Sequence, residues 1–207
     1  MTDYVIDKEL QRKSRIKIVA VFAVFLGPLL LAFIWLQTVK NNPNISVSTH
    51  GELIKPAHPL EPFTLSEADG EAFSLQSFDR FWTMIYFSGG PCAEACEKNL
   101  YHMRQVRLAL VQNMDRVQRV VVVDQQSDIA PELLAEHEGL HVLGGDPQAL
   151  EQFRQQFRNA QSAMQPAGEA IYLVDPLGNL MMRFSGEVDP KGILKDLKHL
   201  LKVSRIG

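Results

Sequence analysis

The N-terminal part of the chain contains one long uninterrupted apolar run. Residues 18–36 are nineteen residues without a charged side chain, close to the length that an α-helix needs to cross about 30 Å of hydrocarbon. Gly27 and Pro28 fall mid-run, where a membrane helix tolerates them, and Trp35 lies near the far interface. The run exceeds the apolar core of a signal peptide and no A-x-A cleavage site follows Leu36. We expect an uncleaved transmembrane helix; the alternative is a cleaved signal peptide.

Charges flank this run unequally and set the expected topology. Five Lys and Arg residues precede it, whereas Lys40 alone follows it closely, which predicts a cytoplasmic N-terminus. We therefore expect a single-pass inner-membrane protein with a cytoplasmic segment at 1–17, a transmembrane helix at 18–36, an extended proline-containing linker at 37–62 and a periplasmic domain at 63–207. Residues after 17 carry 16 basic and 21 acidic side chains, so we expect no nucleic-acid partner.

Beyond the linker, the hydrophobic pattern predicts strands that alternate with helices. Phe81–Phe87 and Arg119–Asp124 are apolar runs typical of buried, adjacent central strands. Amphipathic or capped segments predict helices at 96–111, 131–138, 147–158 and 190–203. Shorter strands are expected at 63–65, 72–75, 140–143, 170–174 and 180–184. This order predicts an α/β domain with a mixed central sheet.

The candidate chemistry lies in two cysteines, Cys92 and Cys96, between the strand that ends at Phe87 and the next helix. Positions i and i+4 share one helical face, so the two sulfurs can form a disulfide or hold a soft ion such as Cu(I). A helix N-terminus favours the thiolate, and Pro91 suits a first helical position. A bridge over so short a loop restrains little chain entropy. We therefore expect a reactive pair; the alternative is two unreactive thiols.

Several segments resemble the SCO (SCO/SenC) family of cytochrome c oxidase assembly proteins. They are Pro62-Phe63-Thr64-Leu65, Asp69-Gly70, Phe73-Ser74-Leu75, Ile85-Tyr86-Phe87-Ser88 before Cys92-x-x-x-Cys96, and Ile171-Tyr172-Leu173-Val174-Asp175-Pro176-Leu177-Gly178. The resemblance implies a membrane-anchored thioredoxin-like fold that binds copper through both cysteines and a distal histidine. It also implies delivery of copper, or reduction of thiols, at the copper site of an oxidase. The expected partners are a respiratory oxidase subunit or its assembly factors.

The sequence departs from the family pattern at the proposed site. The family motif C-P-D-x-C-P is replaced by Cys92-Ala93-Glu94-Ala95-Cys96-Glu97, and the position of the family histidine is Ala167. Two thiolates suit Cu(I), whereas Cu(II) loses a preferred imidazole. We expect a divergent SCO-like protein that acts by thiol–disulfide exchange or transient Cu(I) handling. The alternative is a non-catalytic assembly or scaffolding protein that keeps the fold.

A second motif, His137-Glu138-Gly139-Leu140-His141, spells the H-E-x-x-H pattern of zinc proteases. That site needs both histidines on one helix, and Gly139 favours a helix end between them. We therefore reject the protease interpretation. The other histidines considered as ligands are His50 and His58 in the linker, which are expected to be solvated, and His102 on the helix after the cysteines, which is expected to be solvated or half-buried.

Overall fold

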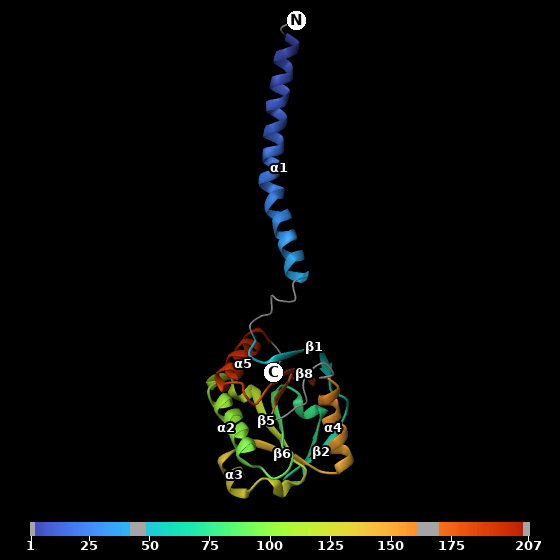
Figure 1. Ribbon diagram of the computed structural model, residues 1–207, viewed down its shortest axis with the longest axis vertical. Coiled ribbons are helices and arrows are strands. Elements are labelled where there is room, and N and C mark those ends of the chain that lie inside the picture. Colours follow the sequence, from blue (N-terminus) through green and yellow to red (C-terminus); the bar gives the residue numbers. More distant parts are fainter. Residues whose placement is uncertain (1–2, 42–48, 161–169, 205–207) are drawn as a thin grey trace. The chain divides into compact units, whose positions relative to one another are not determined.

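The apolar N-terminal run lies inside a single long helix. The structure, a computed structural model, describes residues 3–41, 49–160 and 170–204, and forms two units, Met1–Ser48 and Thr49–Gly207. In the first unit, α1 (Asp3–Asn41) is continuous through Pro28 (Figure 1). Its segment Lys17–Gln37 has the length and composition of a membrane span. The expected apolar helix is confirmed as a candidate transmembrane span.

The second unit is built from alternating strands and helices. Its strands are β1 (Glu52–Pro59), β2 (Thr64–Glu67), β3 (Ala72–Ser74), β4 (Trp82–Phe87), β5 (Val117–Val122), β6 (Leu140–Gly144), β7 (Ile171–Val174) and β8 (Asn179–Phe184). Its α-helices are α2 (Glu94–Leu108), α3 (Pro131–Glu136), α4 (Pro147–Asn159) and α5 (Pro190–Val203). Short 3-10 turns are η1 (Leu75–Phe78), η2 (Val111–Arg116) and η3 (Gln126–Asp128).

The described strands form one mixed sheet in the order β1-β8-β7-β4-β5-β6-β2-β3. β4, β5 and β6 are parallel, whereas β7, β8, β1 and β2 pair antiparallel with their neighbours. All six residues of β5 and the first five of β4 are buried, as expected for central strands covered on both faces. The predicted adjacency of these two strands and the mixed sheet are confirmed.

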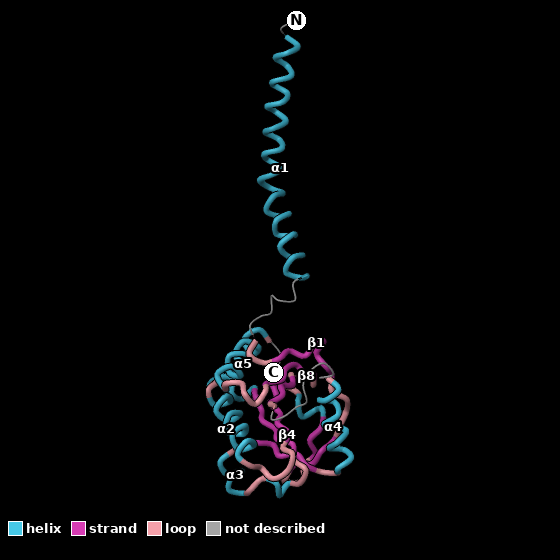
Figure 2. The backbone as a smooth tube through the Cα atoms, in the orientation of Figure 1, coloured by secondary structure: helices cyan, strands magenta, loops and turns pink. Residues whose placement is uncertain are grey.

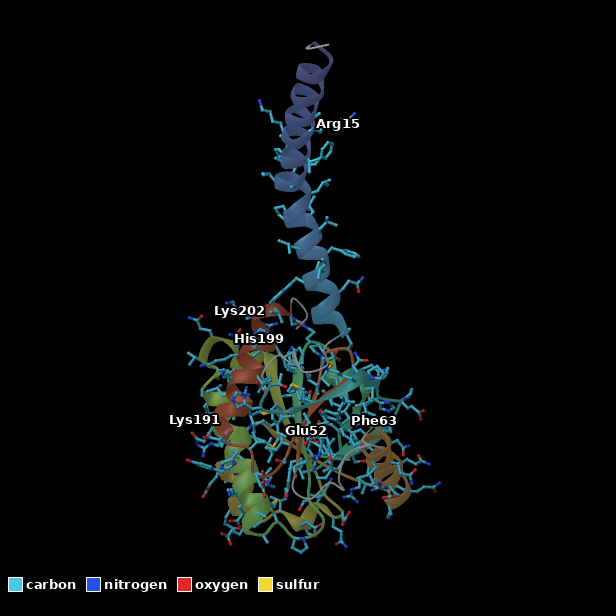
Figure 3. The ribbon with its side chains drawn as sticks, turned by 45° about the horizontal axis from the view of Figure 1, so that its top comes forward. Arg15, Glu52, Phe63, Lys191, His199 and Lys202 are labelled. Carbon is cyan, nitrogen blue, oxygen red and sulfur yellow. A yellow bond between two sulfur atoms is a disulfide. The ribbon has the colours of Figure 1, made fainter. Side chains whose placement is uncertain are left out.

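Helices cover both faces of the sheet (Figures 1 and 2). α2 and α5 pack on the face that carries Met84 and Val121, and α4 packs its phenylalanines on the face that carries Ile85. Successive strand residues point to opposite faces, so neighbouring residues of β4 contribute to different cores. The exposed side of α5 carries Lys191, His199 and Lys202, and Phe63 lies beside α4 (Figure 3).

The expectation of an extended linker up to residue 62 is wrong for Glu52–Pro59, which is an edge strand of the sheet. β1 pairs antiparallel with β8, with a register shift between Leu53 and His58. Its prolines obscured the strand in the sequence. An edge strand tolerates them because only one of its sides needs ladder hydrogen bonds. His58 therefore belongs to the sheet rather than to a flexible tether.

The start of the folded unit is fixed by a buried carboxylate. Asp196 of α5 is 6% exposed, and its Oδ2 accepts hydrogen bonds from the backbone N–H groups of His50 at 2.7 Å and Gly51 at 2.9 Å. The His50 ring nitrogen Nδ1 lies 3.2 Å from Oδ1 of the same carboxylate. His50 is therefore held against α5, while its side chain stays 38% exposed, as expected for a solvated histidine.

Candidate functional site: the Cys92–Cys96 loop

The two cysteines lie between the central strand β4 and α2, as predicted, but they do not share a helix. Ala93 is the N-cap of α2, so Cys92 precedes the helix and Cys96 is its third residue. Pro91 is consequently outside the helix, and the expectation that it occupies the first helical position is wrong. Ala93 has no side chain that can cap a helix, so the sequence held no signal for this boundary.

Cys92 and Cys96 form a disulfide, with their α-carbons 5.2 Å apart. Cys92 is partly exposed, whereas Cys96 is buried at 5% exposure in the core beneath α2. An incoming thiolate can therefore reach the Cys92 sulfur more readily than the Cys96 sulfur. The disulfide is one of the two arrangements that the sequence allowed, and its reversibility stays a prediction.

Ser88 fixes the beginning of the loop that leads to Cys92. Its backbone N–H donates to the Val122 carbonyl at 2.9 Å, and its hydroxyl donates to the Gly90 carbonyl at 2.8 Å. Gly90 has φ +135°, a conformation that other residues rarely adopt. The loop therefore has a defined path from the end of β4 to the cysteines.

Arg154 of α4 holds this loop from the opposite side. Its Nη1 lies 2.6 Å from Oδ1 of Asp124, just beyond β5, and its Nη2 donates to the Ser88 carbonyl at 3.4 Å. The Cys92 backbone N–H donates to the Asp128 carbonyl in η3 at 2.8 Å. The roles of Arg154 and Asp128 could not be found in the sequence, because nothing in their local patterns indicates contacts with a loop 36 to 66 residues earlier.

The first turn of α2 supplies a favourable environment for a sulfur anion. No side chain caps its N-terminus, so the backbone amides of the first turn are available to a negatively charged group beside them. Glu94 and Glu97 lie in this turn and are exposed. Their negative charges repel a thiolate only weakly, because solvent screens the interaction.

The described residues supply sulfur but no further ligand for a metal ion beside the cysteines. No group of three or more His, Cys, Asp or Glu side chains in this part of the chain could hold a metal. Ala167, the position of the family histidine, lies outside the described residues. His102 is half-buried on α2; burial and the nearby Lys98 lower its pKa, and Asp189 partly opposes this effect.

The H-E-x-x-H pattern does not form a zinc site. α3 ends at Glu136, two residues before the predicted end, and His137 is its C-cap; Gly139 has φ +72° in the turn that follows. The prediction that no single helix carries both histidines is confirmed. His141 belongs to β6, and its Nδ1 lies 2.9 Å from Oε2 of Glu67. The two histidines thus belong to different elements.

The central sheet, the covering helices and a disulfide at the β4–α2 junction define a thioredoxin-like class of domain. Residues 82–204 match the family described as "Transmembrane-like, thioredoxin-like, C-terminal domain", and the chain belongs to this family. A search of curated protein sequences finds no match.

Solved structures similar to this chain include Sco proteins. Copper-bound ScoI of Bradyrhizobium japonicum has a TM-score of 0.55 and 24% identity, over 68% of this chain and 98% of that chain. Apo Sco1 of Thermus thermophilus has a TM-score of 0.60 and 21% identity, over 74% and 97%. BsSco, a Sco-family cytochrome c oxidase assembly protein with a disulfide switch, has a TM-score of 0.54 and 19% identity, over 72% and 96%. The resemblance drawn from sequence segments is confirmed for the fold.

Proposed function

We propose that this chain is a membrane-anchored thiol–disulfide exchange protein that assists assembly of the copper site of a respiratory oxidase. The observation that carries the proposal is the Cys92–Cys96 disulfide at a strand–helix junction, with one sulfur accessible and one buried. Similarity to BsSco, a cytochrome c oxidase assembly protein, supports the choice of client. The partner would be an oxidase subunit or one of its assembly factors.

In this proposal the reduced protein transfers two electrons to a disulfide of the client. The Cys92 thiolate attacks one client sulfur, and the client disulfide breaks to give a mixed disulfide and a client thiolate. The Cys96 thiolate then attacks the Cys92 sulfur, which restores the intramolecular disulfide and releases the second client thiolate. The two thiol protons of Cys92 and Cys96 end on the client sulfurs. The first-turn amides of α2 and the fixed Ser88 loop would hold the sulfurs in place during both attacks.

Copper would enter this scheme as cargo rather than as a resident cofactor. Two thiolates at a short separation suit linear Cu(I), and the copper-bound ScoI of similar fold supports testing this ion. With Ala167 at the family histidine position, the pair lacks the imidazole that Cu(II) prefers. We therefore propose that the reduced protein binds at most one Cu(I) and holds Cu(II) poorly.

The membrane arrangement is part of the same proposal. The apolar segment Lys17–Gln37 would span the inner membrane, and the Lys and Arg residues before it would keep the N-terminus in the cytoplasm. The thioredoxin-like unit would then lie in the periplasm, where a disulfide is maintained. A reporter fused at Lys55 that behaves as cytoplasmic would contradict this orientation.

The central experiment measures exchange by the full-length protein in detergent micelles against a synthetic peptide that carries one disulfide. We expect the reduced wild-type protein to reduce the peptide, Cys92→Ser to be inactive, and Cys96→Ser to accumulate a mixed disulfide. His102→Ala is the matched control and should keep full exchange, because that side chain has no role in the proposed steps. Thiols that neither exchange nor bind Cu(I) would favour the non-catalytic scaffolding alternative.

A further inference from the structure

A buried arginine on β5 lacks most of the partners that a guanidinium requires. Arg119 is 2% exposed, and its Nη2 donates to the Glu138 carbonyl at 2.5 Å. Its Nε and Nη1 atoms have no hydrogen-bond partner among the described residues. A guanidinium has five N–H groups arranged as a planar fork, and buried charges are normally paired. Two of the three guanidinium nitrogens of Arg119 therefore donate to no group among the described residues.

A buried histidine at the end of α3 also has a nitrogen without a hydrogen-bond partner among the described residues. His137 is 3% exposed, and its Nδ1 also has no partner in the described part of the chain. Burial lowers the pKa of His137, and the charges of Arg119 and Arg104 lower it further, while Glu136 acts in the opposite direction. At neutral pH the ring is neutral and can donate one hydrogen bond to a ligand.

Two more arginines place positive charge at the same position. Arg104 and Arg107 lie three residues apart on α2, on one helical face. Burial lowers the pKa of Arg119 to about 10, and the charges of Arg107 and Arg104 contribute to the shift, so the three cations are neighbours. Arg107 donates to the Val117 carbonyl at 2.8 Å and lies 3.9 Å from Asp115, whose side chain is 85% exposed.

The surrounding negative charge is too exposed to balance these cations. Asp115 and Glu136 are both on the surface, where solvent weakens their attraction. We name Arg104, Arg107, Arg119 and His137 the Arg119 cluster. Even with its lowered pKa, Arg119 remains charged at neutral pH, so the cluster keeps its positive charge.

We propose that the Arg119 cluster binds a small dissolved oxyanion of the carboxylate or phosphate class. The unpartnered Nε–H and Nη1–H groups of Arg119 can each donate to an oxygen of such a group, and the His137 nitrogen adds a neutral donor. The guanidinium lies directly beneath the exposed Glu138–Gly139 turn, through its bond to the Glu138 carbonyl. Because Arg119 is only 2% exposed, the site favours a small dissolved anion over the side chain of a macromolecule.

The test measures thermal unfolding of the full-length protein in micelles at constant ionic strength, with chloride replaced stepwise by inorganic phosphate or by acetate. A ligand that binds only the folded state raises the midpoint with its concentration. We expect a saturable rise of roughly 3 °C at ten times the dissociation constant. The anion that produces the rise distinguishes a phosphate-type from a carboxylate-type ligand.

Two variants locate the effect, and a third serves as the control. Arg119→Met and Arg104→Gln should each lose the anion-dependent rise. Arg104 is only half-buried, so the Arg104→Gln variant is expected to fold. Arg158→Gln removes an exposed arginine of α4 that pairs with Glu151, and it should respond as the wild type does. Equal midpoints in chloride, phosphate and acetate would overturn the proposal and assign the unpartnered Arg119 nitrogens to interior water. A rise that persists in Arg119→Met would overturn it as well. Neither result depends on the thiol chemistry proposed for Cys92.

Discussion

Two buried charged side chains on the side of the sheet covered by α2 and α5 differ in how many of their polar atoms have hydrogen-bond partners. Asp196 is 6% exposed and accepts two backbone N–H bonds besides its contact with the His50 ring. Arg119 is 2% exposed and has one backbone acceptor, with two of its three nitrogens unpartnered among the described residues. A buried ion that is fully coordinated fixes the surrounding chain, whereas one with unfilled donors destabilises the fold until a ligand or water arrives.

The difference follows from what each charge can reach. Asp196 faces the segment where the chain enters the sheet, and the N–H groups of His50 and Gly51 have no strand partner there, since β1 begins at Glu52. Arg119 lies in a central strand whose own backbone groups are already used by β4 and β6. Its side chain therefore depends on loops and helices outside the sheet for acceptors, and it finds one.

The largest expected effect comes from removal of the coordinated charge. Asp196→Ala leaves the N–H groups of His50 and Gly51 without an acceptor, and we expect a loss of about 3 kcal/mol in the free energy of unfolding. Asp196→Asn keeps one oxygen acceptor and should lose about half as much. Lys195→Ala, an exposed neighbour on α5, is the control and should change little. Denaturant unfolding measures all three, and a loss below about 1 kcal/mol in Asp196→Ala would contradict the role given to this carboxylate.

A smaller loss of stability is expected at the cysteine loop. Arg154→Met removes the partner of the Ser88 carbonyl and of Asp124, whose side chain is 48% exposed and can be rehydrated. We expect a loss of about 1 kcal/mol. If the proposed exchange is correct, peptide reduction should also slow several-fold, because the loop before Cys92 loses its support. Arg158→Met on the same helix is the control. Unchanged stability and rate would mean that the loop is held without Arg154.

The central architecture could be predicted from the sequence because burial leaves a strong pattern. The apolar runs of β4 and β5 identified the middle of the sheet, and the spacing of leucines identified α5. The position of Cys92 and Cys96 after a buried strand was predicted for the same reason. The start of β5 was placed two residues late, since Gln118 and Arg119 look like surface residues although both are buried.

The parts that sequence reasoning missed depend on contacts between distant residues. β1 contains Pro56 and Pro59 and has no clear alternation, so only its pairing with β8 reveals it as a strand. Asp196 looks like an ordinary polar position of an amphipathic helix, because its partners lie about 145 residues earlier in the chain. The support of the Ser88 loop by Arg154 is a similar case, separated by 66 residues.

The third prediction is that substitution of Arg119, unlike that of Asp196, increases the free energy of unfolding. Arg119→Met replaces an incompletely partnered buried cation by an apolar side chain of similar length, and the exposed Glu138 can turn its carbonyl to water. In a chloride buffer without oxyanions, we expect the variant to be more stable than the wild type by about 1 kcal/mol. Arg119→Ala controls for volume and should gain less, because it leaves a cavity. A loss of more than about 1 kcal/mol in Arg119→Met would show that Arg119, like Asp196, stabilises the fold.

The smallest effect concerns pH at the same cluster. The pKa of His137 is lowered in the folded protein by burial, Arg119 and Arg104, against an ordinary value of 6.5. Below pH 6.5 the unfolded chain therefore binds more protons than the folded one, and stability falls as the pH falls through this window. His102 has a lowered pKa as well and contributes with the same sign.

For His137→Gln, we expect the decrease in unfolding midpoint between pH 7.5 and 5.5 to shrink by roughly 1–2 °C relative to the wild type. Arg119→Met should also reduce the decrease, since it removes one cause of the shift but leaves burial and Arg104. His199→Gln, at an exposed position on α5, is the control and should follow the wild-type curve. If His137→Gln and wild type lose stability equally on acidification, the His137 ring has another partner in the folded protein and is not an open member of the Arg119 cluster.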